Sequence, residues 1–164
     1  MKSLFSFPNP ANDTSARIVA TGAVLMSLAY VISGNGWILV PLTYGFIARV
    51  LTGPTLSPLG QLAVRVITPR IKVQHKLVPG PPKRFAQAIG TAFTVAASVL
   101  YLTDMTTASR VVIAMLMGAA SLEAFLGFCL GCWIFSKLMK IGLIPEAICI
   151  ECNDISARIR AQMN

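Results

Sequence analysis

The chain has 164 residues, of which 55% are hydrophobic and only 12% are charged, and its formal net charge is +8. A typical soluble domain carries about 25% charged residues, and a chain this short cannot bury so much apolar surface in a soluble core. The composition therefore excludes an ordinary soluble domain and indicates one membrane domain over residues 1–164. The basic residues lie beside apolar segments without interleaved aromatic residues, which favours anionic lipid over nucleic acid as the partner.

Four apolar segments predict transmembrane helices, although the second is short for a span. They lie near residues 16–33, 37–51, 85–102 and 110–135, and a tail of residues 136–164 follows. A short turn separates the first two segments and another separates the last two, so each pair could form a helical hairpin. The predicted fold is an all-α membrane protein with four transmembrane helices.

The loop between the second and third segments is strongly basic. It carries seven basic residues and no acidic residue from Arg49 to Arg84. More basic residues follow the fourth segment, so the positive-inside rule predicts that this loop and both termini are cytoplasmic.

The same loop contains a predicted helix. Ser57 and Pro58 are typical of a helix start, and apolar residues recur at helical spacing as far as Ile67. We expect a short amphipathic helix that lies in the membrane interface or packs on the bundle.

All four cysteines lie in the last third of the chain, as two C-x-x-C pairs. Cys129 and Cys132 lie near the cytoplasmic end of the fourth predicted helix, and Cys149 and Cys152 lie in a predicted tail helix. The spacing places the two thiols of each pair on one face of a helix.

A glycine and a proline between the two pairs, Gly142 and Pro145, permit the tail to fold back along the membrane surface. We therefore expect a Cα atom of the second pair to lie within about 10 Å of one in the first pair, as a shared site requires.

Several chemistries suit two such pairs. A reducing cytoplasm argues against structural disulfides. Four thiolates at this spacing are typical of a zinc site or an iron–sulfur centre. A C-x-x-C pair can also cycle between dithiol and disulfide, or carry a persulfide, and exchange with a second pair. A fourth interpretation is that the cysteines are inert and act as small hydrophobic side chains.

Glu123 lies near the middle of the fourth predicted helix, where an acidic side chain is costly and is a functional candidate. We expect it to accept a hydrogen bond across helices from a nearby hydroxyl, and the candidates are Thr94, Ser98 and Tyr101. On a straight helix its side chain would point about 120° from Cys129 and about 180° from Cys132, so they should not share a site.

Two basic positions border the predicted spans. Lys83 and Arg84 precede the third span and are expected to anchor it. Arg49 ends the second span and is expected to extend its guanidinium to the lipid headgroups.

Three stretches of the chain resemble the bacterial membrane family catalogued as domain of unknown function 4395. They are KRFAQAIG at residues 83–90, LEAFLGFCLGC at residues 122–132 and GLIPEAICIECN at residues 142–153. Some relatives are fused to, or encoded near, thioredoxin-like and rhodanese-like sulfurtransferase domains. The resemblance thus implies thiol or sulfur chemistry for Cys129, Cys132, Cys149 and Cys152, and a location in the bacterial inner membrane.

The leading hypothesis is a thiol–disulfide or persulfide relay that works with a soluble thioredoxin-like or rhodanese-like partner. The first alternative is a metal site, zinc or iron–sulfur, with Cys129, Cys132, Cys149 and Cys152 as ligands. The second is a non-catalytic subunit of a larger membrane complex. Small residues along the predicted spans would suit a compact bundle or a homodimer. The sequence leaves open the substrate and whether the protein is an enzyme.

Overall fold

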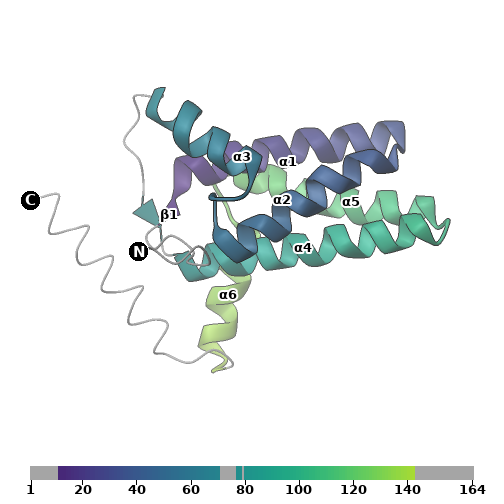
Figure 1. Ribbon diagram of the computed structural model, residues 1–164. Coiled ribbons are helices and arrows are strands. Elements are labelled where there is room, and N and C mark those ends of the chain that lie inside the picture. The colour runs from purple at the N-terminus through teal and green to yellow at the C-terminus, as the bar shows by residue number, and fades with distance from the viewer. Residues whose placement is uncertain (1–10, 71–76, 79, 143–164) are drawn as a thin grey trace, which may run out of the picture.

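The computed structural model describes residues 11–70, 77–78 and 80–142, and these residues are mainly helical. Figure 1 shows α1, α2, α4 and α5 side by side in a bundle, with α3, β1 and α6 gathered at one end. The main helices are α1 (Asp13–Ser33), α2 (Leu39–Thr52), α4 (Gly80–Leu102), α5 (Thr106–Ser121) and α6 (Leu130–Lys140).

Three helical segments are long and apolar enough to cross a membrane. They are α1, α4 and the continuous segment Thr106–Leu126, which joins α5 to the π-helical turn η4 (Leu122–Leu126). The second apolar segment, Gly36–Thr52, joins the 3-10 turn η1 (Gly36–Ile38) to α2 and is shorter than these three.

Local signals in the sequence set the two ends of α1. The Asn12 side chain accepts hydrogen bonds from the backbone N–H groups of Thr14 and Ser15, at 2.9 and 3.4 Å. This cap starts the helix at Asp13, three residues before the predicted boundary. The helix ends at Gly34, whose φ of 67° lies in the left-handed region that glycine adopts readily.

The bundle core contains buried hydroxyl groups that bind one another. Ser109 donates a hydrogen bond to the backbone carbonyl of Ala97 at 2.7 Å, so the hydroxyl of Tyr30 is the donor in its 2.6 Å contact with Ser109. These bonds join α1, α4 and α5 where Tyr30, Ala97, Ile113 and Leu42 are fully buried. Apolar packing and interhelical hydrogen bonds thus act together at this level of the bundle.

The helix predicted in the central loop is present. The Ser57 side chain caps it by accepting from the N–H of Gly60 at 3.2 Å, and Pro58 is its first residue. It consists of α3 (Pro58–Gln61), the π-helical turn η2 (Leu62–Ile67) and the 3-10 turn η3 (Thr68–Arg70). Leu59 packs against Gly22 of α1, while Leu62 and Val64 are exposed.

A short antiparallel pairing closes the same end of the bundle. The strand β1 (Ala11–Asn12) pairs with β2 (Leu77–Val78), with Ala11 opposite Val78. The start of α1 is thereby held beside the chain that leads into α4.

The fourth predicted span, residues 110–135, is not one continuous helix. The helix ends at Gly127, where φ is 66°, and α6 then runs across the end of the bundle (Figure 1). The N–H of Gly127 donates to the carbonyl of Glu123, and the N–H of Phe128 donates to that of Leu122, both at 3.1 Å. These bonds satisfy the last carbonyls of the helix, so Gly127 acts as a left-handed helix cap.

Candidate thiol site and buried charges

The first cysteine pair lies at the start of α6 and not on the face of a longer helix. Cys129 is the capping residue, with an extended backbone at φ −85° and ψ 104°, and Cys132 lies in the first turn. Both thiols are free and both residues are half-buried. The predicted pair therefore gains a feature that the sequence did not indicate, which is a cysteine at a helix N-terminus.

The surroundings of the two thiols shift their pKa values in opposite directions. The pKa of Cys129 lies below its ordinary value, because the Cys132 thiol acts as a hydrogen-bond donor to it. The Cys132 backbone N–H and the Lys83 ammonium act in the same direction, whereas burial and the Glu123 carboxylate oppose them. The pKa of Cys132 is raised because its thiol is that donor and because it is buried. Cys129 is therefore the more acidic thiol of the pair and Cys132 the less acidic one.

Lys83 is buried between two carboxylates from distant parts of the chain. Its Nζ lies 3.0 Å from Asp13 Oδ1 and 2.6 Å from Glu123 Oε1. The side chain of Lys83 is 6% exposed, against 18% for Asp13 and 13% for Glu123. The triad joins α1, α4 and η4. The expectation that Lys83 anchors the third span at the headgroups is thus wrong, because its ammonium is taken up inside the protein.

The expected hydroxyl partners of Glu123 are also wrong. Thr94 donates to the carbonyls of Gly90 and Thr91 in its own helix, and Ser98 faces Thr43 at 3.2 Å. Glu123 accepts instead from Lys83, because a buried carboxylate is stabilised more by a cation than by a neutral hydroxyl.

Glu123 and Cys129 lie on the same cavity, contrary to the straight-helix geometry. The left-handed turn at Gly127 reverses the chain between them, so the angular rule for one helix does not hold. Arg17 of α1 stabilises the turn by donating to the carbonyl of Phe125 at 3.0 Å. The same guanidinium covers Gly127, where an added Cβ would lie 3.2 Å from its Cζ.

α6 is held against α4 by close packing. A Cβ added at Gly131 would lie 2.5 Å from the Cβ of Ala86 and 2.6 Å from its Cα. The rings of Phe85 and Phe135 pack beside this contact at a tilt of 57°, with centroids 5.5 Å apart. Because Gly131 lies between the two cysteines, this contact fixes their position relative to Lys83 and Glu123.

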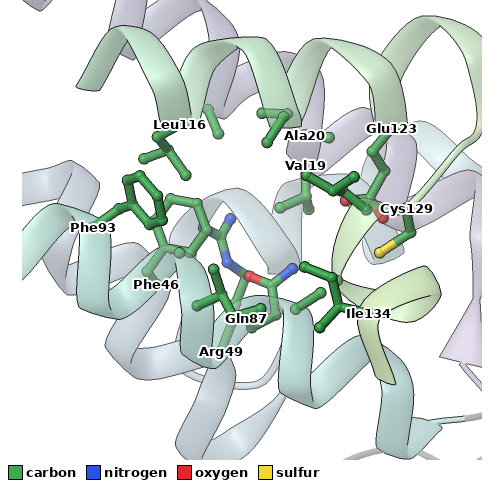
Figure 2. A pocket seen from close by; sticks show the side chains of 18 residues that line it. Val19, Ala20, Phe46, Arg49, Gln87, Phe93, Leu116, Glu123, Cys129 and Ile134 are labelled. Atoms are coloured by element: carbon green, nitrogen blue, oxygen red, sulfur yellow. The ribbon is translucent and has the colours of Figure 1, made fainter. Parts of the chain in front are cut away.

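A small cavity of about 80 Å³ lies next to Cys129. Figure 2 shows Arg49, Gln87, Glu123 and Cys129 around it. Arg49 is 5% exposed and lies over the ring of Phe46, with its Cζ 4.4 Å from the ring centroid. The prediction that Arg49 extends to the headgroups is therefore wrong, since its guanidinium faces into the protein.

Sequence reasoning missed most of the residues around Cys129. Asp13, Lys83, Arg49 and Gln87 come from three different helices, and only tertiary contacts bring them together. The pair Asn12-Asp13 is the local signal for the start of α1, and it does not indicate the ion pair of Asp13.

The second pair, Cys149 and Cys152, lies outside the described residues, as does the predicted tail helix. The expected approach of the two pairs therefore stays a prediction. Within residues 11–70, 77–78 and 80–142, no group of three or more His, Cys, Asp and Glu side chains could hold a metal ion. A four-thiolate centre would need both pairs.

Comparisons with known proteins place the chain in a family but give it no activity. No curated protein and no solved structure matches it. A family model described as "Domain of unknown function (DUF4395)" matches residues 11–140, which include all the main helices and the first cysteine pair. The chain therefore belongs to the DUF4395 family.

Proposed function

We propose that the protein is a membrane-bound thiol relay, which passes disulfide or sulfane sulfur between a soluble partner and its own two cysteine pairs. The observation that carries this proposal is the placement of Cys129 at the N-terminus of α6, beside the Cys132 thiol and the buried Lys83. A helix N-terminus, a thiol donor and an ammonium group all favour the thiolate, which is the reactive form of cysteine.

The disulfide version of the relay follows from the different protonation of the two thiols. The Cys129 thiolate attacks a partner disulfide, forms a mixed disulfide and releases the partner's first thiolate. Cys132 then loses its proton and attacks Cys129, which forms the Cys129–Cys132 disulfide and releases the second partner thiolate. The partner is reduced by two electrons and the pair is oxidised by two. Exchange with Cys149 and Cys152 would return the first pair to its dithiol form.

The proposed orientation keeps this chemistry on the cytoplasmic side. We infer that Gly36–Thr52 is a fourth span. The 3 residues of η1 and the 14 residues of α2 together extend about 25 Å, which approaches the hydrocarbon thickness of about 30 Å. The exposed basic residues Arg65, Arg70, Arg84 and Lys140 lie in the elements at the α6 end. The positive-inside rule then places this end and both termini in the cytoplasm of a bacterial inner membrane. A soluble thioredoxin-like or rhodanese-like partner could reach Cys129 there.

The pH dependence of alkylation tests the proposal. The variant Cys149→Ser/Cys152→Ser leaves the first pair as the sole thiols, and iodoacetamide modification of Cys129 would be followed by mass spectrometry. Because only the thiolate reacts, the rate should rise with pH through a midpoint below that of an ordinary cysteine. Lys83 and the Cys132 thiol lower this midpoint, and Glu123 raises it.

Cys132→Ala is the matched control, since it keeps the helix but removes the side-chain donor. It should move the Cys129 midpoint to higher pH. A midpoint at or above that of an ordinary cysteine in the parent would refute the thiolate assignment. Stoichiometric zinc or iron in the wild-type protein, with thiols that do not react until the metal is removed, would replace the relay with the metal site.

A further inference from the structure

Arg49 is a buried cation with two unsatisfied donors. Among the described residues its Nε and Nη1 atoms have no hydrogen-bond partner, and neither Asp13 nor Glu123 lies within ion-pair distance. Phe46 covers one face of the guanidinium, which leaves its N–H edge as the unsatisfied part. A buried charge is costly unless a counter-charge and hydrogen bonds compensate it. The unsatisfied N–H groups of Arg49 are therefore open to an acceptor that enters the cavity.

Gln87 contributes a second unsatisfied group to the same cavity. Its Oε1 atom is buried without a partner, and both Arg49 and Gln87 reach into the cavity (Figure 2). The two side chains offer guanidinium donors and an amide to one occupant. The unsatisfied amide oxygen is an acceptor and does not bind a deprotonated oxyanion directly, so Gln87 would bind the anion only with its amide flipped to present the NH₂ group.

The cavity size selects the class of occupant. Its volume of about 80 Å³ is several times the roughly 10–15 Å³ that one water requires, yet well below the roughly 300–1,000 Å³ typical of organic ligand sites. Glu123 also lines the cavity, with one carboxylate oxygen bound to Lys83, and the remaining walls are mainly apolar, from residues such as Val19, Phe93 and Leu116. A small inorganic anion matches both the volume of the cavity and the positive charge of Arg49.

A second cavity offers an approach from the α3 side. It measures about 280 Å³ and is lined by Ser15, Thr68 and Lys83, and it shares Arg49, Gln87 and Val19 with the first cavity. Arg49 thus borders both spaces. Asp13 and Glu123 more than offset the charge of Lys83, so of the two cationic side chains that line these cavities only Arg49 keeps donors open to an anion.

We propose that Arg49 and Gln87 form a binding site for a small oxyanion in the cavity beside Cys129. Resting on the proposed thiol chemistry, we further infer that the anion carries a sulfane sulfur, with thiosulfate as the simplest member of the class. A planar guanidinium can bind two oxygens of an oxyanion at once. Arg49 and Cys129 line the same cavity, so an anion bound to Arg49 lies in the space that Cys129 borders.

The resulting sulfur transfer is balanced without a further reactant. The Cys129 thiolate attacks the outer sulfur of thiosulfate, and a sulfur–sulfur bond forms between them. The bond from that sulfur to the sulfonate group breaks, and its electron pair leaves with sulfite. The products are a Cys129 persulfide anion and sulfite, and Arg49 stabilises the charge on the departing oxyanion.

Binding is tested on the full chain with Cys129→Ser, in nanodiscs, because this variant lacks the thiol that is proposed to attack the probe. Equilibrium dialysis with radiolabelled thiosulfate should detect saturable binding that sulfite and sulfate compete for. Adding Arg49→Gln should weaken binding at least tenfold. Adding Arg65→Gln is the charge-matched control, since Arg65 is exposed on η2 and outside both cavities, and it should leave binding unchanged.

Gln87→Glu keeps the proposal testable if Arg49→Gln does not fold. The new carboxylate supplies an internal counter-charge, so it should abolish thiosulfate binding while the thermal midpoint is kept or raised. Absence of binding to Cys129→Ser, or binding that survives both Arg49→Gln and Gln87→Glu in folded protein, would overturn the site.

The neutral reagent 4,4′-dithiodipyridine separates this inference from the proposed relay. It oxidises Cys129 and Cys132 without needing an anion site. The wild-type protein is treated with the reagent, and the Cys129→Ser variant is tested for thiosulfate binding. If the wild type reacts but the variant does not bind thiosulfate, the anion site alone is refuted. Thiosulfate binding without thiol oxidation, and without a persulfide by mass spectrometry, would refute the relay and the sulfane step but keep the site.

Discussion

The two ends of the bundle hold their buried polar groups in different ways. At the end that contains Gly34, the groups are neutral, and most are satisfied, as in the chain from Tyr30 to Ser109 to the carbonyl of Ala97. The exception is the buried hydroxyl of Ser27, which has no hydrogen-bond partner among the described residues. At the end that contains α6, the groups are charged. Lys83 binds two carboxylates, while Arg49 has unsatisfied donors.

The difference separates groups that stabilise the fold from groups that we propose serve a site. Neutral hydrogen bonds between membrane helices contribute modestly and leave nothing unsatisfied. Buried charges in a membrane protein are expensive and often mark function. The charged end also contains the first cysteine pair and both cavities, so the costly groups and the reactive groups coincide.

The largest effect should come from Lys83→Met at the charged end. The change leaves Asp13 and Glu123 as buried carboxylates without their cation, and breaking a buried pair in this way costs about 3–5 kcal/mol. The free energy of unfolding, measured by denaturant titration in detergent, should fall by that amount.

The control is Lys83→Met combined with Asp13→Asn and Glu123→Gln, which removes the unpaired charges and should recover part of the loss. If Lys83→Met alone is as stable as the wild type, the three groups do not form a buried ion triad. Loss of Lys83 should also raise the alkylation midpoint of Cys129, because the ammonium favours the thiolate.

A glycine at the same end tests the position of α6. Gly131→Ala places a methyl group 2.5 Å from the Cβ of Ala86, so α4 and α6 must separate. Such overpacking typically costs about 1–3 kcal/mol. Cys129 should also react more slowly with alkylating reagent at neutral pH, because the shift moves it away from Lys83.

Gly118→Ala is the matched control, since a Cβ there meets nothing within 4 Å. In the interior of α5 alanine is preferred to glycine, so this change should be neutral or stabilising by up to about 1 kcal/mol. Equal losses for both variants would mean that Gly131 is not a close contact.

How far the sequence predicts the molecule depends on the range of the contacts involved. Ser57 and Pro58 set the start of α3 by local capping, which is visible in the sequence. Gly127 is different, because a glycine in a membrane helix suits both close helix packing and a left-handed cap. Arg17, 110 residues earlier, is one of the contacts that accompany the cap, and no local pattern contains it.

The site shows the same limit. The spacing of Cys129 and Cys132 identified the pair, but its place at a helix start followed from the turn at Gly127. The pairing of Lys83 depends on α1 and η4 meeting beside α4, so a headgroup anchor was the local expectation. The burial of Arg49 likewise follows from packing between helices.

The smallest effect should come from the neutral end, where Tyr30→Phe removes one hydroxyl from a fully buried site. Ser109 keeps its bond to the carbonyl of Ala97, so the variant loses one interhelical bond and leaves no backbone group unsatisfied. Bonds of this kind average about 0.6 kcal/mol in membrane proteins, and we expect a loss of that order.

Tyr44→Phe is the control for Tyr30→Phe, because the hydroxyl of Tyr44 donates to the exposed carbonyl of Leu56 at 3.2 Å and should contribute less. Neither change should move the alkylation midpoint of Cys129, since no charge is altered near the thiols. A shift in that midpoint with Tyr30→Phe would show that the two ends are coupled, and the separation between stabilising and functional polar groups would then fail.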